Sequence, residues 1–135
     1  MSTRCEVRIV EKLSWKKQPL EIKLYHHHDG YPEGVGQDLI QLCEEHYKRV
    51  GKMFMFDDAS HLANLLIKKA DDEYQLTQYR HIDIEYLYII DINKGTITCK
   101  SVYYKDWNSD HARPTVRKTI DLSKFFSKDL TEQVK

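Results

Sequence analysis

The sequence between residues 82 and 103 reads IDIEYLYIIDINKGTITCKSVY and has the pattern of a β-hairpin. Polar and apolar residues alternate from Ile82 to Ile92, and a period of two is typical of a β-strand. Asn93-Lys94-Gly95 is a turn sequence with glycine where a positive φ is expected. Because both faces of the first strand are apolar in its middle, we expect it to be central, with residues 96–103 as its partner.

Three more segments carry the strand pattern. Residues 5–10 and 20–28 alternate in the same way, and we expect them to pair as a hairpin with a long loop. Residues 115–120 are predicted to form a short strand at the edge of the sheet. The pattern therefore predicts an antiparallel sheet of four to five strands.

Two segments carry the period of an amphipathic helix. Apolar residues recur every three or four positions from 37 to 50, and Gly51 follows where such a helix would end. A second helix is predicted from 58 to 70, and a shorter one over 122–130. The predicted fold class is α+β, with two main helices on one face of the sheet, a short C-terminal helix, and all of 1–135 in a single domain.

The charges balance, with 21 Lys and Arg against 21 Asp and Glu. A zero net charge argues against nucleic-acid binding, which usually relies on a basic excess, and it removes the repulsion that opposes self-association. No signal peptide or membrane-spanning run is visible, so we expect a cytoplasmic protein with no membrane contact. The three cysteines are expected to be buried free thiols: Cys5, Cys43 and Cys99.

The segment from 26 to 36, HHHDGYPEGVG, concentrates the polar chemistry of the chain. On a strand, His26 and His28 share one face and lie beside Asp29, so they could hold a metal ion and serve as catalytic residues. Further ligands would have to come from distant segments, with His81, Asp110 and His111 as candidates. The competing interpretation is that His26 and His28 continue the inward face of the strand and are hydrogen-bonded at its end.

The second half of this segment predicts an ordered turn before the first helix, with ligand-binding candidates at Asp29, Tyr31, Gly34 and Gly36. The two later glycines precede a helix N-terminus, where backbone N–H groups favour anions. The alternative is that the glycines serve the backbone alone, and we expect at least one of Gly30, Gly34 and Gly36 to have a positive φ. We also expect the carboxylate of Asp29 to accept backbone N–H groups of the turn.

An aromatic stretch follows the hairpin, with Tyr103, Tyr104 and Trp107 close to Lys105 and Arg113. These side chains could form a surface for a protein partner, stack on nucleic-acid bases, or line the edge of the core. Together with the zero net charge, the aromatic residues favour self-association, for which a two-fold homodimer is the commonest form.

The run HHHDGYPEGVGQDLIQLC, residues 26–43, resembles a family of small uncharacterised proteins of bacteria and their phages. The strand Asp83–Ile92 resembles the second recurring segment of that family. The resemblance implies a bacterial or mobile-element setting inside the cell, but no catalytic role. The positions that carry the family pattern are His27, Asp29, Gly30, Tyr31, Pro32, Val35 and Gly36.

These observations favour a small accessory protein that binds a protein partner or a small ligand near the 29–36 turn. No cofactor motif is visible, and we expect none to be needed. The alternative is a metal-assisted hydrolase that uses His26, His28 and Asp29. The residues alone leave open whether the protein is an enzyme.

Overall fold

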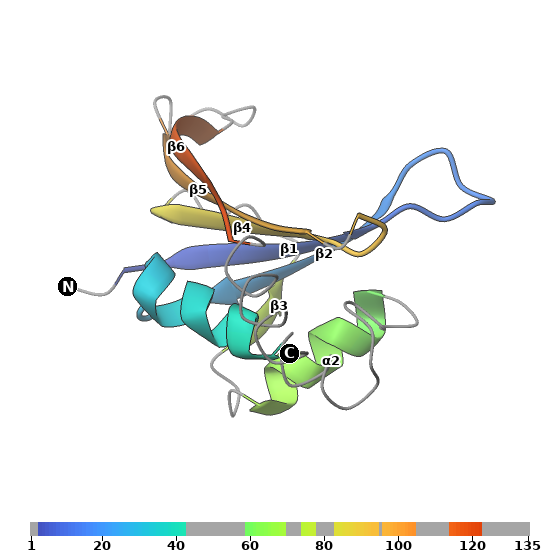
Figure 1. Ribbon diagram of the computed structural model, residues 1–135, viewed down its shortest axis with the longest axis horizontal. Coiled ribbons are helices and arrows are strands. Elements are labelled where there is room, and N and C mark those ends of the chain that lie inside the picture. The colour runs from blue at the N-terminus through green and yellow to red at the C-terminus, as the bar shows by residue number, and fades with distance from the viewer. Residues whose placement is uncertain are drawn as a thin grey trace, which may run out of the picture.

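The computed structural model describes residues 3–42, 59–69, 74–77, 83–94, 96–104 and 114–122. A single sheet forms the centre of this part of the molecule, and helices cover one of its faces (Figure 1). The strands are β1 (Cys5–Glu11), β2 (Leu20–His26), β3 (Tyr74–Thr77), β4 (Tyr86–Asp91), β5 (Thr96–Tyr104) and β6 (Pro114–Asp121). The helical elements are the short π-helix η1 (Pro32–Gly36), which continues as α-helix over 37–42, and α2 (Ala59–Lys69).

The sheet has six strands in the order β3-β2-β1-β4-β5-β6. All neighbouring pairs are antiparallel except β1 and β4, which run parallel. The predicted antiparallel sheet of four to five strands is therefore wrong. Alternation in a sequence reports which faces of a strand are buried, and it does not report the direction of the neighbouring strand. The four residues of β3 are too few to show a period.

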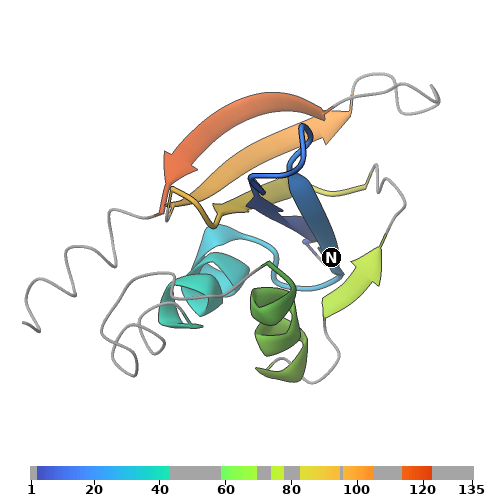
Figure 2. The ribbon, with the colours of Figure 1, turned by 90° about the vertical axis from the view of Figure 1, so that its right-hand side faces the viewer.

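The two main helices of the predicted fold are also wrong, because the described residues are mostly β-structure with two short helical elements. The helix that follows η1 is described only over 37–42, and α2 has 11 residues. Residues 43–50 of the first predicted helix and nearly all of the predicted C-terminal helix lie outside the described residues. Both helical elements lie on the same side of the sheet, as expected (Figure 2).

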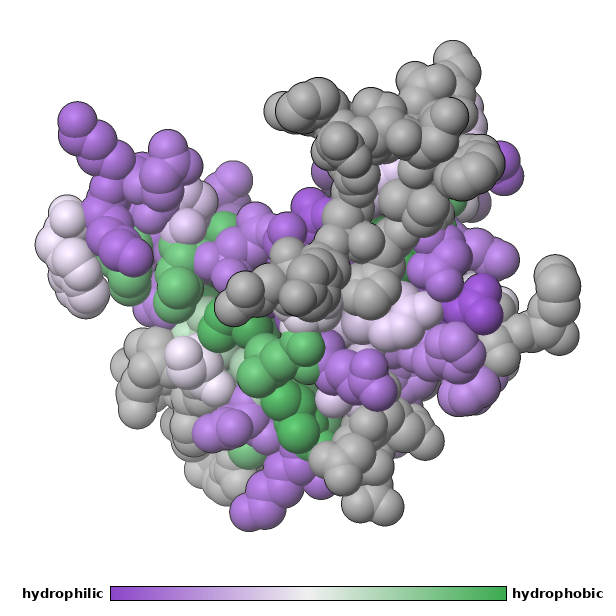
Figure 3. Space-filling model, turned by 180° about the vertical axis from the view of Figure 1, so that it is seen from behind, coloured by the Kyte–Doolittle hydropathy of each residue, from purple (hydrophilic) through white to green (hydrophobic). Residues whose placement is uncertain are grey.

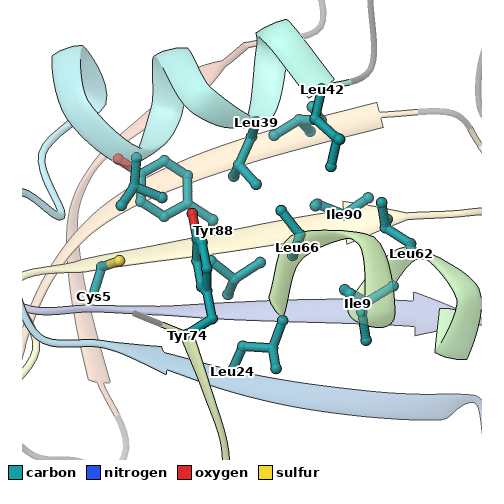
Figure 4. Packing of buried hydrophobic residues seen from close by; sticks show 14 of the residues in the cluster. Cys5, Ile9, Leu24, Leu39, Leu42, Leu62, Leu66, Tyr74, Tyr88 and Ile90 are labelled. Carbon is teal, nitrogen blue, oxygen red and sulfur yellow. The ribbon is translucent and has the colours of Figure 1, made fainter. Parts of the chain in front are cut away.

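The main hydrophobic core lies between the sheet and these helices (Figure 4). Strand pairing aligns Val7 with Leu24 on one side and with Tyr88 on the other, and all three side chains are buried on this helix-covered face. The helices contribute Leu39, Leu62 and Leu66. Cys5 and Cys99 are buried free thiols in the same core, as predicted, and Cys43 lies outside the described residues.

The opposite face of the sheet carries a second, smaller cluster. Its buried members are Tyr25, Ile84, Leu87 and Val102. Glu6 on the same face is also fully buried, and its Oε1 accepts a hydrogen bond from Arg8 Nε at 2.7 Å. This face therefore mixes apolar and charged side chains. Within the described ranges, no helix is long and apolar enough to cross a membrane.

Candidate functional site

The three consecutive histidines at the end of β2 have different environments. His26 lies on the helix-covered face, is 3% exposed, and packs its ring against that of Tyr74 with 4.6 Å between the centroids. His27 points to the opposite face and is exposed, and His28 is exposed beyond the end of the strand. The predicted metal pair therefore consists of one core residue, His26, and one surface residue, His28.

Among the residues that the structure describes, no three His, Cys, Asp or Glu side chains gather in a way that could hold a metal ion. The distant ligands considered from the sequence, His81, Asp110 and His111, lie outside these ranges. The predicted metal pair His26 and His28 thus finds no third ligand in the described part of the chain.

Four polar side chains instead meet at the end of the sheet where β2 stops, and we call them the strand-end cluster: Arg4, Tyr25, His27 and Asp83. Arg4 Nε lies 3.3 Å from His27 Nδ1 and 3.2 Å from Asp83 Oδ2. The hydroxyl of Tyr25 lies 3.3 Å from each of these same two atoms. The pairing of β1 with β2 and of β1 with β4 brings the three chain segments together at this point.

Electrostatics keep the Tyr25 hydroxyl protonated. Burial and, to a smaller extent, the neighbouring carboxylate of Asp83 together raise the pKa of Tyr25 to about 12. The ion pair of Arg4 and Asp83 is partly exposed, with 36% and 46% of the side chains accessible. The cluster is therefore open to solvent on one side and held by a protonated phenol on the other.

The Asp29–Gly36 turn lies next to the strand-end cluster in the chain. The backbone N–H of Gly30 donates to the carbonyl of Thr3 at 2.9 Å, which attaches the turn to the segment before β1. Gly34 N–H donates to the Tyr31 carbonyl at 2.9 Å, and Val35 N–H donates to the Asp29 carbonyl at 3.0 Å. The N–H of Gly34, which was considered for an anion cradle, is thus engaged inside the turn.

The expectation of a positive φ at a glycine of this turn is wrong, because the residue with a left-handed backbone is Asp29, at φ 52°. The glycines are needed for space instead. A Cβ on Gly34 would collide with the carbonyl oxygen of Asp29, and one on Gly30 would lie 2.7 Å from the Cβ of Cys5. Gly36 is less constrained, since its added Cβ would lie 3.4 Å from Leu122 and Tyr88 side-chain atoms.

The side chain of Asp29 accepts a hydrogen bond from the Tyr31 hydroxyl at 3.2 Å. This bond raises the pKa of Tyr31, although both residues are on the surface. The turn itself is closed by the main-chain carbonyl of Asp29, whereas a role of its carboxylate as backbone acceptor was expected. Asp29 and Tyr31 are therefore surface groups that bond to each other.

The aromatic residues after the hairpin do not share one surface within the described ranges. Alternation along β5 places Tyr103 and Tyr104 on opposite faces of the sheet. The guanidinium of Arg117 lies 4.3 Å from the centre of the Tyr103 ring, and Tyr104 packs against the smaller apolar cluster. Trp107, Lys105 and Arg113 lie outside the described residues.

A shallow hollow with a volume of about 300 Å³ lies at the opposite end of β2, where this strand extends past β3. Leu76 is 65% exposed there, and the ion pair of Lys23 and Glu21 spans 3.8 Å. The hollow is lined by Glu21, Ile22, Lys23, Leu76 and Thr77. A band of apolar surface also crosses the side of the molecule drawn in Figure 3.

Sequence reasoning assigned no site role to any of the four cluster residues: Arg4, Tyr25 and Asp83 were missed, and His27 was named only as a position of the family pattern. Arg4 could have been found, because a hairpin register that pairs Cys5 with His26 leaves Arg4 beside His27. Asp83 could not, since it depends on the parallel pairing of β1 and β4. No protein-family model, curated protein or solved structure matches this chain.

Proposed function

We propose that the protein is a small binding module whose ligand, free or carried by a partner protein, contacts the strand-end cluster beside the Asp29–Gly36 turn. The observation that supports this most is the meeting of Arg4, Tyr25, His27 and Asp83 around one point that is open to solvent. These side chains come from three separate parts of the chain, and they hold one another in fixed positions. A preorganised set of polar groups loses little freedom when a ligand binds.

Stability alone is a poor reason for such an arrangement. Exposed ion pairs typically contribute about 0–1 kcal/mol to folding. The side chains of Arg4 and Asp83 are 36% and 46% accessible, and His27 is exposed. Their contacts therefore add little to the stability of the protein. An arrangement of this kind is better suited to holding the side chains in place for a ligand.

The metal-assisted hydrolase has less support. It requires His26, which lies under the helices at 3% exposure, whereas His28 and Asp29 are on the surface. A bacterial or phage setting rests on the sequence resemblance alone, and the cytoplasmic location and the homodimer remain predictions from the sequence.

The proposal is tested by titrating ¹⁵N-labelled protein with four probes of different chemistry: acetate, inorganic phosphate, tetramethylammonium and glucose. We expect at least one probe to give saturable shifts at Arg4, His27 and Gly30, with none at Leu76 or Thr77. Arg4→Ala should abolish these shifts. Lys23→Ala, a matched loss of one cation in the middle of β2, should leave them unchanged.

An absence of saturable shifts at the cluster with all four probes would overturn the small-ligand form of the proposal. Equal loss in Arg4→Ala and Lys23→Ala would also overturn it, because binding would then follow overall charge rather than the cluster.

A further inference from the structure

Four atoms of the strand-end cluster form a closed circuit of contacts. Arg4 Nε and Tyr25 Oη each lie within 3.3 Å of both His27 Nδ1 and Asp83 Oδ2. Arg4 Nε carries one hydrogen and cannot accept, and the carboxylate of Asp83 can only accept. The Tyr25 hydroxyl has one hydrogen to donate.

This circuit determines which nitrogen of His27 carries the proton in the neutral imidazole. Since Arg4 Nε is a donor, the facing His27 Nδ1 must accept, and the proton lies on Nε2. Two hydrogens, one from Arg4 and one from Tyr25, then serve two acceptors, and the circuit is complete. A proton on Nδ1 would bring two N–H donors face to face.

The same circuit leaves hydrogen-bond donors directed away from it. Among the described residues, no hydrogen bond is recorded to His27 Nε2 or to the two terminal nitrogens of Arg4. His27 is exposed, and 36% of the Arg4 side chain is accessible. In the adjoining turn, the carboxylate of Asp29 has its Oδ1 engaged by the Tyr31 hydroxyl. The open side of the cluster therefore offers donors, one of them on a permanent cation, beside the carboxylate of Asp83, whose side chain is 46% accessible.

We propose that the strand-end cluster binds an oxyanion, a carboxylate or phosphate group, through the terminal N–H groups of Arg4 and the Nε2–H of His27. This inference rests on the proposed function and names the chemistry of its ligand. Guanidinium groups match the geometry of carboxylate and phosphate oxygens, and charge-assisted hydrogen bonds are the stronger kind. Because Asp83 offsets the charge of Arg4, we expect a bare ion to bind with millimolar affinity and the rest of the ligand to supply the remainder.

Two substitutions of His27 test separately the acceptor role of Nδ1 in the circuit and the donor role of Nε2 toward a ligand. His27→Asn places an amide near the position of Nδ1, where its oxygen can accept in the circuit, but it removes the donor at Nε2. His27→Gln extends an amide N–H to the position of Nε2 and removes the acceptor at Nδ1. We expect His27→Asn to weaken acetate or phosphate binding at least tenfold, and His27→Gln to change it less than threefold.

The titrations with acetate and with phosphate distinguish the two sources of the oxyanion.

In the unmodified protein, ¹⁵N chemical shifts of the imidazole should show the proton on Nε2. A proton on Nδ1 would overturn the inference, and this measurement does not depend on whether either variant folds.

Equal weakening by the two His27 variants would also overturn it, because the donor at Nε2 would then have no separate role. If glucose or tetramethylammonium bound at the cluster while acetate and phosphate did not, the proposed function would stand and the oxyanion would be wrong.

Discussion

His26 ends β2 and His27 follows it on the opposite face of the sheet, and the surroundings of the two residues have little in common. His26 packs on Tyr74 under the helices, close in the sheet to Cys5. His27 lies on the other face with Arg4 and Tyr25, and it is open to solvent. The comparison teaches that three histidines in a row are not one motif, because the strand period divides them between the core and the surface.

The two faces also differ in how they satisfy their polar groups. On the helix-covered face, Tyr88 donates to the Gly30 carbonyl at 2.7 Å, and Glu11 Oε1 accepts the N–H of Ala59 at the start of α2 at 2.8 Å. Both bonds are buried and join separate elements of the fold. On the opposite face, the contacts of the strand-end cluster are longer and reach the solvent. We therefore expect substitutions that remove these buried bonds to affect stability, and substitutions within the strand-end cluster to affect binding.

The largest effect is expected from Gly34→Ala, which tests whether the turn between the two histidine environments is needed for the fold. The added methyl group would collide with the Asp29 carbonyl, so the turn must deform, at a cost of about 3 kcal/mol in the free energy of unfolding. Gly36→Ala is the control, since its methyl group makes contacts of 3.4 Å and should cost less than about 1 kcal/mol. Urea denaturation of both variants measures the difference, and a larger loss in Gly36→Ala would contradict the account of the turn.

A pair of tyrosine substitutions compares the two faces directly. Tyr88→Phe removes a buried donor and leaves the Gly30 carbonyl without it, so we expect a loss of about 1–2 kcal/mol. Tyr25→Phe removes a hydroxyl whose contacts are 3.3 Å long, and the loss should be about 0.5 kcal/mol. Thermal and urea unfolding give both values. If Tyr25→Phe were the more destabilising change, the strand-end cluster would be part of the structural framework.

Substitutions at Asp29 sharpen the role of the turn. Its φ of 52° is a conformation that glycine adopts without cost and that a Cβ disfavours, although Asp tolerates it better than most residues. We expect Asp29→Ala to lose about 1 kcal/mol, whereas Asp29→Gly should be close to neutral. Equal losses in the two variants would indicate that the carboxylate, through its bond with Tyr31, matters more than the backbone.

The effect expected to be smallest at neutral pH is that of the buried ionisable groups, because they change stability only at alkaline pH. Burial raises the pKa of Cys99 from 9.0 to about 11 and that of Tyr25 from 10.0 to about 12. When the pKa of an acidic group is higher in the folded than in the unfolded protein, the fold keeps its full stability at pH values below the unfolded pKa. This stability is lost as the pH rises toward the folded pKa. Unfolding measured from pH 8 to 12 should show a loss that begins near pH 9. Cys99→Ala should reduce the loss between pH 9 and 11, while the thiol of Cys5, whose pKa burial also raises, still sets the onset. A stability that stayed flat to pH 11 would contradict the burial of these thiols.

Much of the secondary structure could be predicted from the sequence, because it depends on local patterns. The strand predicted over 115–120 corresponds to β6, and the helix predicted over 58–70 corresponds to α2. The hairpin turn at Asn93 was likewise readable, since its residues favour a turn without help from the rest of the chain.

The arrangement of these elements could not be predicted in the same way. The parallel contact of β1 with β4 depends on residues far apart in the sequence, and the sequence of neither strand specifies which strand it pairs with. The strand-end cluster depends on the same contact, because Asp83 reaches Arg4 only through it. The histidine segment contributes His27 to the cluster, and Arg4 and Asp83 come from two other segments.

The parallel contact also has a consequence for the order of folding. Residues of β1 can pair with β2 as soon as the first hairpin has formed, but their other edge waits for β4. During synthesis at roughly 5–20 residues per second, that edge stays unpaired for several seconds or more. An unpaired strand edge can pair with another chain, so the nascent N-terminal hairpin is exposed to aggregation during this interval.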